Sequence, residues 1–160
     1  MSARETKRHT ALLKTYGGRY HRVNGERGPF SWLCPTCSAP ADTIEHYPPL
    51  SRVSDYEAMG GVIYIRYPCC QSCNSYGAAV LDDTFIDRFE RVKDRMARKW
   101  SKYLKMCEWD EDELDELGSN LRTAVESGLS KHEEYTQRLE YYLGVDTIIT
   151  AVHDRYGDGV

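Results

Sequence analysis

The chain lacks any run of the roughly 20 apolar residues that a membrane-spanning helix needs. Its 160 residues also contain no internal repeat and no low-complexity tract. Phenylalanine is scarce, with 3 Phe against 12 Tyr. These absences exclude a membrane span and a repeat array, and they favour one domain with a modest core. Tyrosine suits a small core, because its ring can be buried while its hydroxyl reaches water.

The first eight residues are polar and charged, and no apolar segment follows them, so the sequence predicts no secretory signal. The expected compartment is therefore the cytoplasm, where thiols stay reduced. In that compartment the six cysteines favour metal binding over disulfide bonds.

The net charge is only -4, but the charge is unevenly distributed. Residues 1–33 carry seven Lys or Arg and two acidic residues, and residues 84–105 carry eight and three. Residues 106–134 carry two Lys or Arg and ten acidic residues. Two basic segments therefore flank a cysteine-rich middle, and such segments are typical of proteins that bind nucleic acid.

Residue patterns predict many helices and a small β part. A basic helix is expected from about Ala3 to Thr15, and short strands at 42–46 and 62–65. A long helix is expected after an N-cap at Asp82 or Asp83. Its apolar stripe, at three- and four-residue steps, is Phe85, Phe89, Val92, Met96, Trp100, Leu104 and Cys107, which makes Cys107 a predicted core thiol.

Capping-box patterns predict two further helix starts, at Asp110 with Glu113 and at Ser130 with Glu133. A last short helix is expected over 145–156. The fold class predicted from these elements is α+β. The predicted parts are a basic N-terminal helix and loop at 1–30, a zinc-bound module with the long basic helix at 31–107, and a helical C-terminal subdomain at 108–160.

Two Cys-x-x-Cys turns offer four thiolates, the ligand set that structural zinc prefers in tetrahedral sites. The predicted Zn²⁺ ligands are Cys34, Cys37, Cys70 and Cys73. Cys69 is an alternative to Cys70, but the two-residue spacing to Cys73 favours Cys70. The segment between the turns is longer than a zinc ribbon needs, so the module encloses something else.

The enclosed segment has Glu45 and His46, followed two residues later by Pro-Leu-Ser-Arg, which ends at Arg52. This run resembles the HNH endonucleases, whose ββα-metal motif often lies between two Cys-x-x-Cys turns. The second half is similar to the phage recombination endonuclease VII branch. The residues that match this branch are Arg66, Cys70, Cys73, Asn74 and Gly77, and the whole resemblance covers about residues 32–85.

The resemblance implies a zinc-stapled ββα-metal fold and hydrolysis of DNA phosphodiester bonds. It assigns His46 as the general base, and Glu45 and Asn74 as ligands of a catalytic Mg²⁺ or Mn²⁺. A neutral imidazole can take a proton near physiological pH, and oxygen ligands suit these cations. Because Glu45 and His46 are adjacent on a predicted strand, a local distortion is expected where they meet. The resemblance also suggests a phage or mobile element as the source, and hence the host cytoplasm.

Two positions depart from the HNH pattern. Ile65 or Tyr64 stands where many members have an Asn that orients the base, and Gly77 stands where a Lys or His is frequent. The alternatives to an active nuclease are an inactive DNA- or protein-binding regulatory module and a purely structural zinc domain. In those cases Glu45 is an ordinary exposed acid and Asn74 a helix cap.

DNA is the expected partner. Arg52 and Arg66 are predicted to hold the scissile phosphate, and Arg88, Arg91 and Arg95 to contact DNA from the long basic helix. Two amphipathic helices at the C-terminal end make a homodimer possible. A second basic candidate is the N-terminal set Arg4, Lys7, Arg8, Lys14, Arg19 and Arg22, with Tyr16, Tyr20 and His21 available for stacking or phosphate hydrogen bonds. No role is assigned to His9, His132 or His153.

Overall fold

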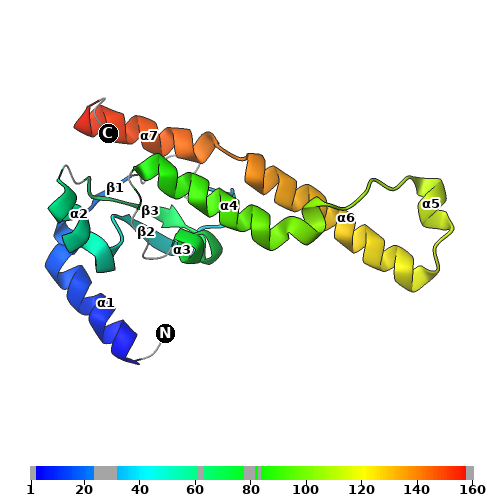
Figure 1. Cartoon of the computed structure of the whole chain (residues 1–160), viewed down its shortest axis with the longest axis horizontal. Coiled ribbons are helices and arrows are strands. Elements are labelled where there is room, and N and C mark those ends of the chain that lie inside the picture. Colours follow the sequence, from blue (N-terminus) through cyan, green and yellow to red (C-terminus); the bar gives the residue numbers. More distant parts are fainter. Residues whose placement is uncertain (1–2, 24–31, 61–62, 78–81, 83, 158–160) are drawn as a thin grey trace.

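The computed structural model describes residues 3–23, 32–60, 63–77, 82 and 84–157 (Figure 1). It confirms the α+β class, with helices arranged around a small three-stranded sheet. Within these ranges no helix has the length and apolar character needed to cross a bilayer. The elements are α1 (Ala3–Tyr16), η1 (Gly17–Arg19), β1 (His21–Arg22), β2 (Thr43–Tyr47), η2 (Leu50–Arg52), α2 (Val53–Met59), β3 (Ile65–Cys69), α3 (Gln71–Gly77), α4 (Phe85–Leu104), α5 (Glu111–Asp115), α6 (Ser119–Glu140) and α7 (Leu143–Tyr156).

The sheet has β3 at its centre, antiparallel to β2 and parallel to the short β1. Glu45 lies opposite Tyr67, and His46 lies opposite Arg66. Because successive strand residues point to opposite faces, these two pairs lie on different sides of the sheet. Tyr67 stacks against Phe89 of α4, so the side with Glu45 and Tyr67 is named the α4 side. The side with His46 and Arg66 is named the α1 side.

The helix α4 covers the sheet with the apolar stripe that the sequence predicts. Phe85, Phe89, Val92, Met96 and Trp100 are all buried, and Met96 is 0% exposed. A capping box begins the helix, but its N-cap is Thr84 rather than Asp82 or Asp83, because the Thr84 hydroxyl accepts from the Asp87 amide at 3.1 Å. Asp83 lies outside the described residues, and Asp82 has other partners described below.

The prediction that Cys107 is a core thiol is wrong, since its side chain is exposed. The reason is the end of α4, which falls at Leu104. Three residues beyond the helix, the three- and four-residue spacing no longer keeps a side chain on the buried stripe.

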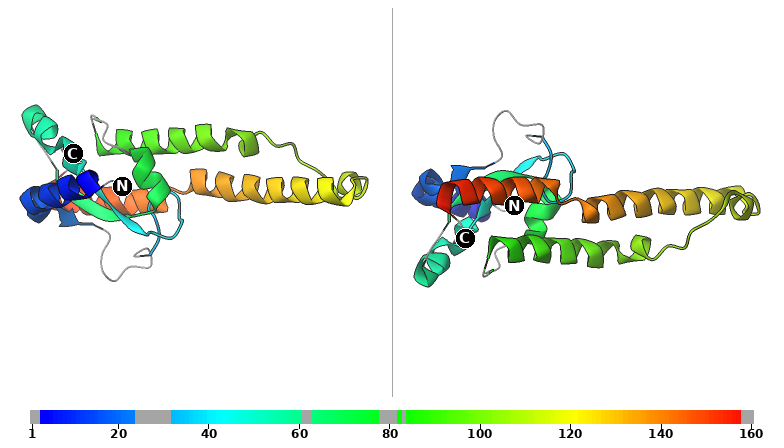
Figure 2. Two further views of the ribbon diagram at one scale, coloured as in Figure 1. Left: turned by 90° about the horizontal axis from the view of Figure 1, so that it is seen from below. Right: turned by 90° about the horizontal axis from the view of Figure 1, so that it is seen from above.

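The second half of α4 runs beside the C-terminal half of α6, and the rest of α6 continues the arm away from the sheet to α5 at its far end (Figures 1 and 2). Trp100 stacks on Tyr135 across the arm, with ring centroids 4.3 Å apart. The capping box of Asp110 with Glu113 is confirmed. The predicted helix start at Ser130 is wrong, because α6 continues through it. Gly128 does not break α6, and there Met106 packs so closely that an added Cβ would lie 2.6 Å from its sulfur.

The last helix, α7, returns from the arm to the cysteine module (Figure 2). Its Val145, Ile148 and Val152 belong to the main core. Gly144 lies directly against the backbone of Pro35, where an added Cβ has no room. Part of the predicted C-terminal subdomain therefore contributes to the core around the cysteines. The predicted division at residues 30 and 107 and the predicted homodimer stay predictions.

The strand predictions differ in outcome. The strand expected at 42–46 is confirmed as β2, with a shift of one residue. The strand expected at 62–65 begins only at Ile65 and continues to Cys69, because pairing with β2 extends over these five residues and includes Pro68. Residues 61 and 62 lie outside the described residues.

A candidate metal cluster and the groove beside it

The four predicted zinc ligands form one compact cluster. The Sγ atoms of Cys34, Cys37, Cys70 and Cys73 all lie within 4.8 Å of one another, and every one of these residues is buried. The first knuckle is closed by hydrogen bonds from the amides of Cys37 and Ser38 to the Cys34 carbonyl, at 3.3 and 2.9 Å. Four buried thiols at this separation fit a tetrahedral metal ion, for which zinc is the plausible choice.

Cys69 lies next to this cluster as a fifth thiol. Its Sγ is 3.7 Å from the Sγ of Cys34, and its side chain is buried. The mutually close group contains Cys70 rather than Cys69, which agrees with the predicted ligand set. Cys69 is therefore a neighbour of one ligand, placed to donate a weak S–H hydrogen bond to it.

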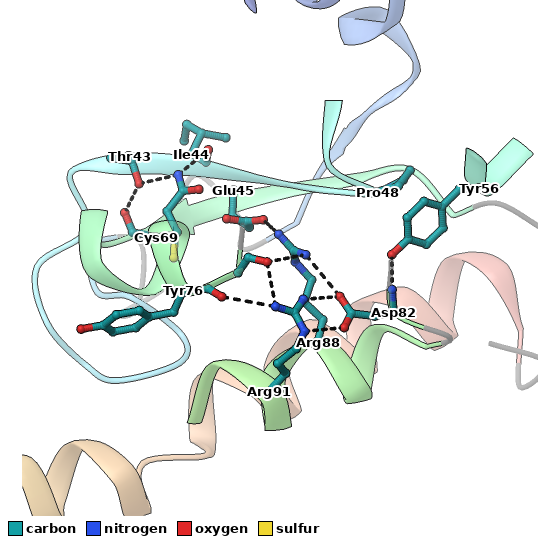
Figure 3. A network of polar contacts seen from close by, with 12 residues as sticks. Thr43, Ile44, Glu45, Pro48, Tyr56, Cys69, Tyr76, Asp82, Arg88 and Arg91 are labelled. Carbon is teal, nitrogen blue, oxygen red and sulfur yellow. Dashed lines mark hydrogen bonds and ion pairs between the residues drawn. The ribbon is translucent and has the colours of Figure 1, made fainter. Parts of the chain in front are cut away.

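Glu45 lies on the α4 side of the sheet and is buried, with 4% of its surface exposed (Figure 3). This finding overturns the alternative that Glu45 is an ordinary exposed acid. Its Oε1 accepts a hydrogen bond from Nη2 of Arg88, whose side chain is 3% exposed. Its Oε2 is buried without a hydrogen-bond partner among the described residues. The pair is thus a charged contact inside the protein, satisfied on one oxygen only.

Three arginines of α4 bind the C-terminal end of α3, and Figure 3 shows two of them, Arg88 and Arg91. Arg88 and Arg91 donate to the Gly77 carbonyl at 3.2 and 3.0 Å, and Arg95 donates to the Tyr76 carbonyl at 2.8 Å. Arg91 also binds both carboxylate oxygens of Asp82, at 2.6 and 2.5 Å. These contacts satisfy carbonyls that a helix end leaves unpaired, and cations are favourable at that end.

The same contacts correct one predicted DNA contact. Arg88 is buried and its guanidinium group binds Glu45, Asp82 and Gly77, so it does not reach a DNA backbone in this structure. Arg91 and Arg95 also bind protein oxygens, and for these two a DNA contact stays a prediction.

Gly77 makes room for the Arg88–Glu45 pair. A Cβ at this position would lie 2.8 Å from Nη2 of Arg88 and 3.5 Å from Oε1 of Glu45. The guanidinium group of Arg88 therefore occupies the space that a side chain at position 77 would fill.

Asn74 lies inside α3 and not at its start, so the alternative that it caps this helix is wrong. Its Nδ2 donates to the Thr43 hydroxyl at 3.0 Å and to the Ile44 carbonyl at 3.2 Å. With both hydrogens directed at β2, the carbonyl oxygen is the atom left to accept a ligand.

The oxygens of Glu45 and Asn74 can be tested as ligands of Mg²⁺ or Mn²⁺. A carboxylate oxygen and an amide oxygen match the preference of these cations, which keep several waters when few protein ligands are present. The unpartnered Oε2 of Glu45 is the observation that fits such an ion. Burial raises the pKa of Glu45 to about 7, against the charge of Arg88, and a bound cation would favour the ionised form.

His46 lies on the α1 side and is half-buried. Its ring packs against the ring of Tyr20, with the centroids 4.9 Å apart and the two rings perpendicular. The Tyr20 hydroxyl donates to the Pro48 carbonyl at 2.6 Å, which fixes this ring in turn. Burial lowers the pKa of His46 to about 4, and the charges of Arg66 and His9 act in the same direction. The imidazole is therefore neutral at physiological pH and able to accept a proton.

A groove with a volume of about 920 Å³ brings the predicted site residues together. His46, Glu45, Asn74 and Arg66 all line it, whereas Arg52 does not. Arg52 instead forms an ion pair with Asp55 at 2.9 Å. The remaining lining residues are Glu5, Arg8, His9, Leu12, Leu13, Thr43, Ile44, Pro49, Leu50, Ser51, Gln71, Ser75 and Arg88.

The expected distortion between Glu45 and His46 is absent. All five residues of β2 pair in register with β3, from Thr43 opposite Cys69 to Tyr47 opposite Ile65. The two side chains consequently point to opposite sides of a regular strand. Glu45 contributes to the groove from the α4 side, next to Arg88, and His46 from the α1 side.

Sequence reasoning did not find several of these contacts. Tyr20 was a candidate for stacking on a base, and in the structure it packs on His46 instead. His9 has no motif around it, and only the position of α1 brings it into the groove. The Arg88–Glu45 pair joins residues 43 positions apart, and no local pattern signals such a pair.

Comparison with family models, with curated proteins and with solved structures found no match to this chain. The resemblance to HNH endonucleases therefore rests on the residues quoted above.

Proposed function

We propose that the protein is a metal-dependent endonuclease of the HNH type that hydrolyses DNA phosphodiester bonds. The observation that carries the proposal is the groove, which His46, Glu45, Asn74 and Arg66 line together. The order of the elements also supports it, because the antiparallel strands β2 and β3 lie between the two cysteine turns and α3 begins within the second turn.

In this proposal His46 is the general base. Its imidazole takes the proton of the attacking water, and neutrality at physiological pH is what this role requires. Tyr20 packs against the ring, and Arg66 is its cross-strand neighbour on β3. The guanidinium of Arg66 is exposed and binds the phosphate that is attacked.

Glu45 and Asn74 would hold a Mg²⁺ or Mn²⁺, which would supply positive charge for the leaving oxygen. Arg88 keeps Oε1 of Glu45 occupied, so Oε2 is the oxygen available to the cation. Asn74 is fixed by its bonds to Thr43 and Ile44 before any cation binds. The buried thiol cluster would bind zinc and keep the two cysteine turns, and with them β2 and α3, in place.

A second candidate is a catalytically inactive zinc module that binds DNA or protein. The observation that favours it is the burial of Glu45 against Arg88, which already supplies the positive charge that a catalytic cation would add. In this case the groove binds a ligand, but it does not cleave one.

A plasmid-nicking assay with Mg²⁺ or Mn²⁺ separates the two candidates. The zinc-loaded protein is expected to nick the plasmid, and His46→Ala to slow nicking by about 10²- to 10⁴-fold, the usual contribution of a general base. His132→Ala is the matched control, because His132 lies on α6 and hydrogen-bonds the Tyr103 carbonyl at 2.9 Å. If the well-folded wild type cleaves none of the three substrates, which are duplex, nicked and branched DNA, the nuclease proposal is wrong.

A further inference from the structure

The helix α1 forms one wall of the groove. The residues that it contributes are Glu5, Arg8, His9, Leu12 and Leu13, which recur at steps of three and four. This spacing places them on a single helical face. The groove is thus built by the cysteine module on one side and by the first helix of the chain on the other.

The C-terminal half of α1 is anchored to the module. Leu12, Leu13 and Tyr16 pack on a small apolar cluster that contains Tyr20, Leu50 and Val53 and is separate from the main core. Arg8 and His9 precede this anchor by about one helical turn and are exposed. The two polar side chains therefore lie along the groove beyond the last apolar contact of the helix.

The groove collects more positive than negative groups. Arg8 and Arg66 are exposed cations on its opposite walls. Of the two acids in the lining, Glu45 is paired with Arg88. Arg8 makes no ion pair with a described residue. An anionic ligand therefore suits the groove, and a nucleic-acid backbone supplies anionic groups at regular spacing.

The other cations of the basic N-terminal segment do not line the groove. Arg19 forms an ion pair with Glu57, and its Nη1 lies 3.3 Å from the Tyr64 hydroxyl. Lys7 and Lys14 lie on α1 outside the groove lining. Arg8 is thus the cation of this segment that the structure directs toward the candidate site.

Resting on the proposed function, we infer that α1 is the second wall of the nucleic-acid site, and that Arg8, assisted by His9, binds a backbone phosphate next to the one held by Arg66. The volume of about 920 Å³ is large enough for a short stretch of one strand. Leu12, Ile44 and Leu50 supply apolar surface for the sugars between the phosphates.

The test measures how binding of a fluorescent single-stranded oligonucleotide depends on salt. The full, zinc-loaded chain carries His46→Ala and is assayed without Mg²⁺ or Mn²⁺, so that cleavage does not interfere. Arg8→Ala is expected to weaken binding about tenfold at low salt. It should also make the slope of log K against log salt smaller by about 0.7, the value for one phosphate contact on a single strand. Arg8→Lys should restore the slope, because Lys keeps the point charge.

Lys7→Ala is the matched control, because it removes the same charge from the neighbouring position of α1, outside the groove lining. It is expected to leave the slope within experimental error. Equal losses for Arg8→Ala and Lys7→Ala would overturn the inference, since α1 would then contribute only diffuse charge. Absence of oligonucleotide binding by the parent protein would overturn it too. Circular dichroism checks that each variant is folded.

The two proposals fail separately. If wild type binds with the expected Arg8 effect but never cleaves DNA, the inference on α1 stands and the nuclease proposal falls. If wild type cleaves DNA and Arg8→Ala behaves like Lys7→Ala in binding and cleavage, the nuclease proposal stands and the inference falls.

Discussion

The two sides of the β2–β3 sheet belong to one short segment of chain and differ in almost every physical property. On the α4 side, Glu45 and Tyr67 are buried against a long helix. On the α1 side, His46 is half-buried and Arg66 is exposed to the groove. Changes to Tyr67 and Arg88 on the α4 side should therefore alter mainly stability, whereas changes to His46 and Arg66 on the α1 side should alter mainly binding and chemistry.

The largest expected effect is the removal of the metal from the thiol cluster. Structural zinc supplies about 10–16 kcal/mol in small zinc domains, which is comparable with the whole free energy of unfolding of a typical domain. Cys34→Ser, or chelation of the wild type, should therefore unfold the module around β2 and α3. Zinc content by mass spectrometry and thermal melting by circular dichroism measure the effect.

Cys107→Ser is the control for this prediction, because Cys107 is exposed and outside the cluster. It should retain both the zinc and the melting temperature of wild type. A metal-free wild type that melts as the metal-loaded protein does would contradict a structural role for the cluster.

The second effect concerns the buried ion pair on the α4 side. Arg88→Met leaves the carboxylate of Glu45 without its partner, and removal of one member of a buried pair costs about 3–5 kcal/mol. Urea denaturation should show this loss. Arg98→Met is the matched control on the same helix, since the pair of Arg98 with Asp94 is largely exposed and should contribute less than about 1 kcal/mol. Equal midpoints for the two variants would mean that the buried pair contributes nothing to stability.

The features that the sequence could predict are those that depend on local spacing. The cluster follows from local spacing, because two Cys-x-x-Cys turns already place their thiols in pairs, and only the meeting of the pairs is tertiary. The apolar stripe of α4 is likewise a local pattern, and it is confirmed as far as Trp100. Strand 43–47 was predicted to within one residue for the same reason.

Other features depend on contacts between distant segments. The roles of Arg88, Arg91 and Arg95 could not be predicted, because a basic helix face has the same sequence whether it binds DNA or the carbonyls of α3. The end of α4 before Cys107 and the uninterrupted α6 depend on the packing of the arm. Arg8 and His9 enter the groove only because η2 and Tyr20 hold α1 in place.

The smallest expected effect is the pH dependence of stability that the two neighbouring residues His46 and Glu45 produce. The pKa of His46 is lowered from 6.5 to about 4 by burial, so between these values the unfolded chain binds a proton that the folded chain does not. Stability should therefore fall as the pH falls from 6.5 to 4. The loss is about 1 kcal/mol once the partial exposure of the ring is considered.

The titration of Glu45 should change stability in the opposite direction. Its pKa is raised from 4.5 to about 7 by burial, so the folded chain holds the extra proton, and stability should rise as the pH falls from 7 to 4.5. The free energy of unfolding should be measured across this pH range for wild type, His46→Gln and Glu45→Gln. The difference between wild type and each variant, plotted against pH, should have slopes of opposite sign for the two variants. Slopes of the same sign would contradict the prediction that burial shifts the two pKa values in opposite ways. NMR can then follow the His46 ring directly, and a pKa near 6.5 would show that burial does not lower the pKa of His46.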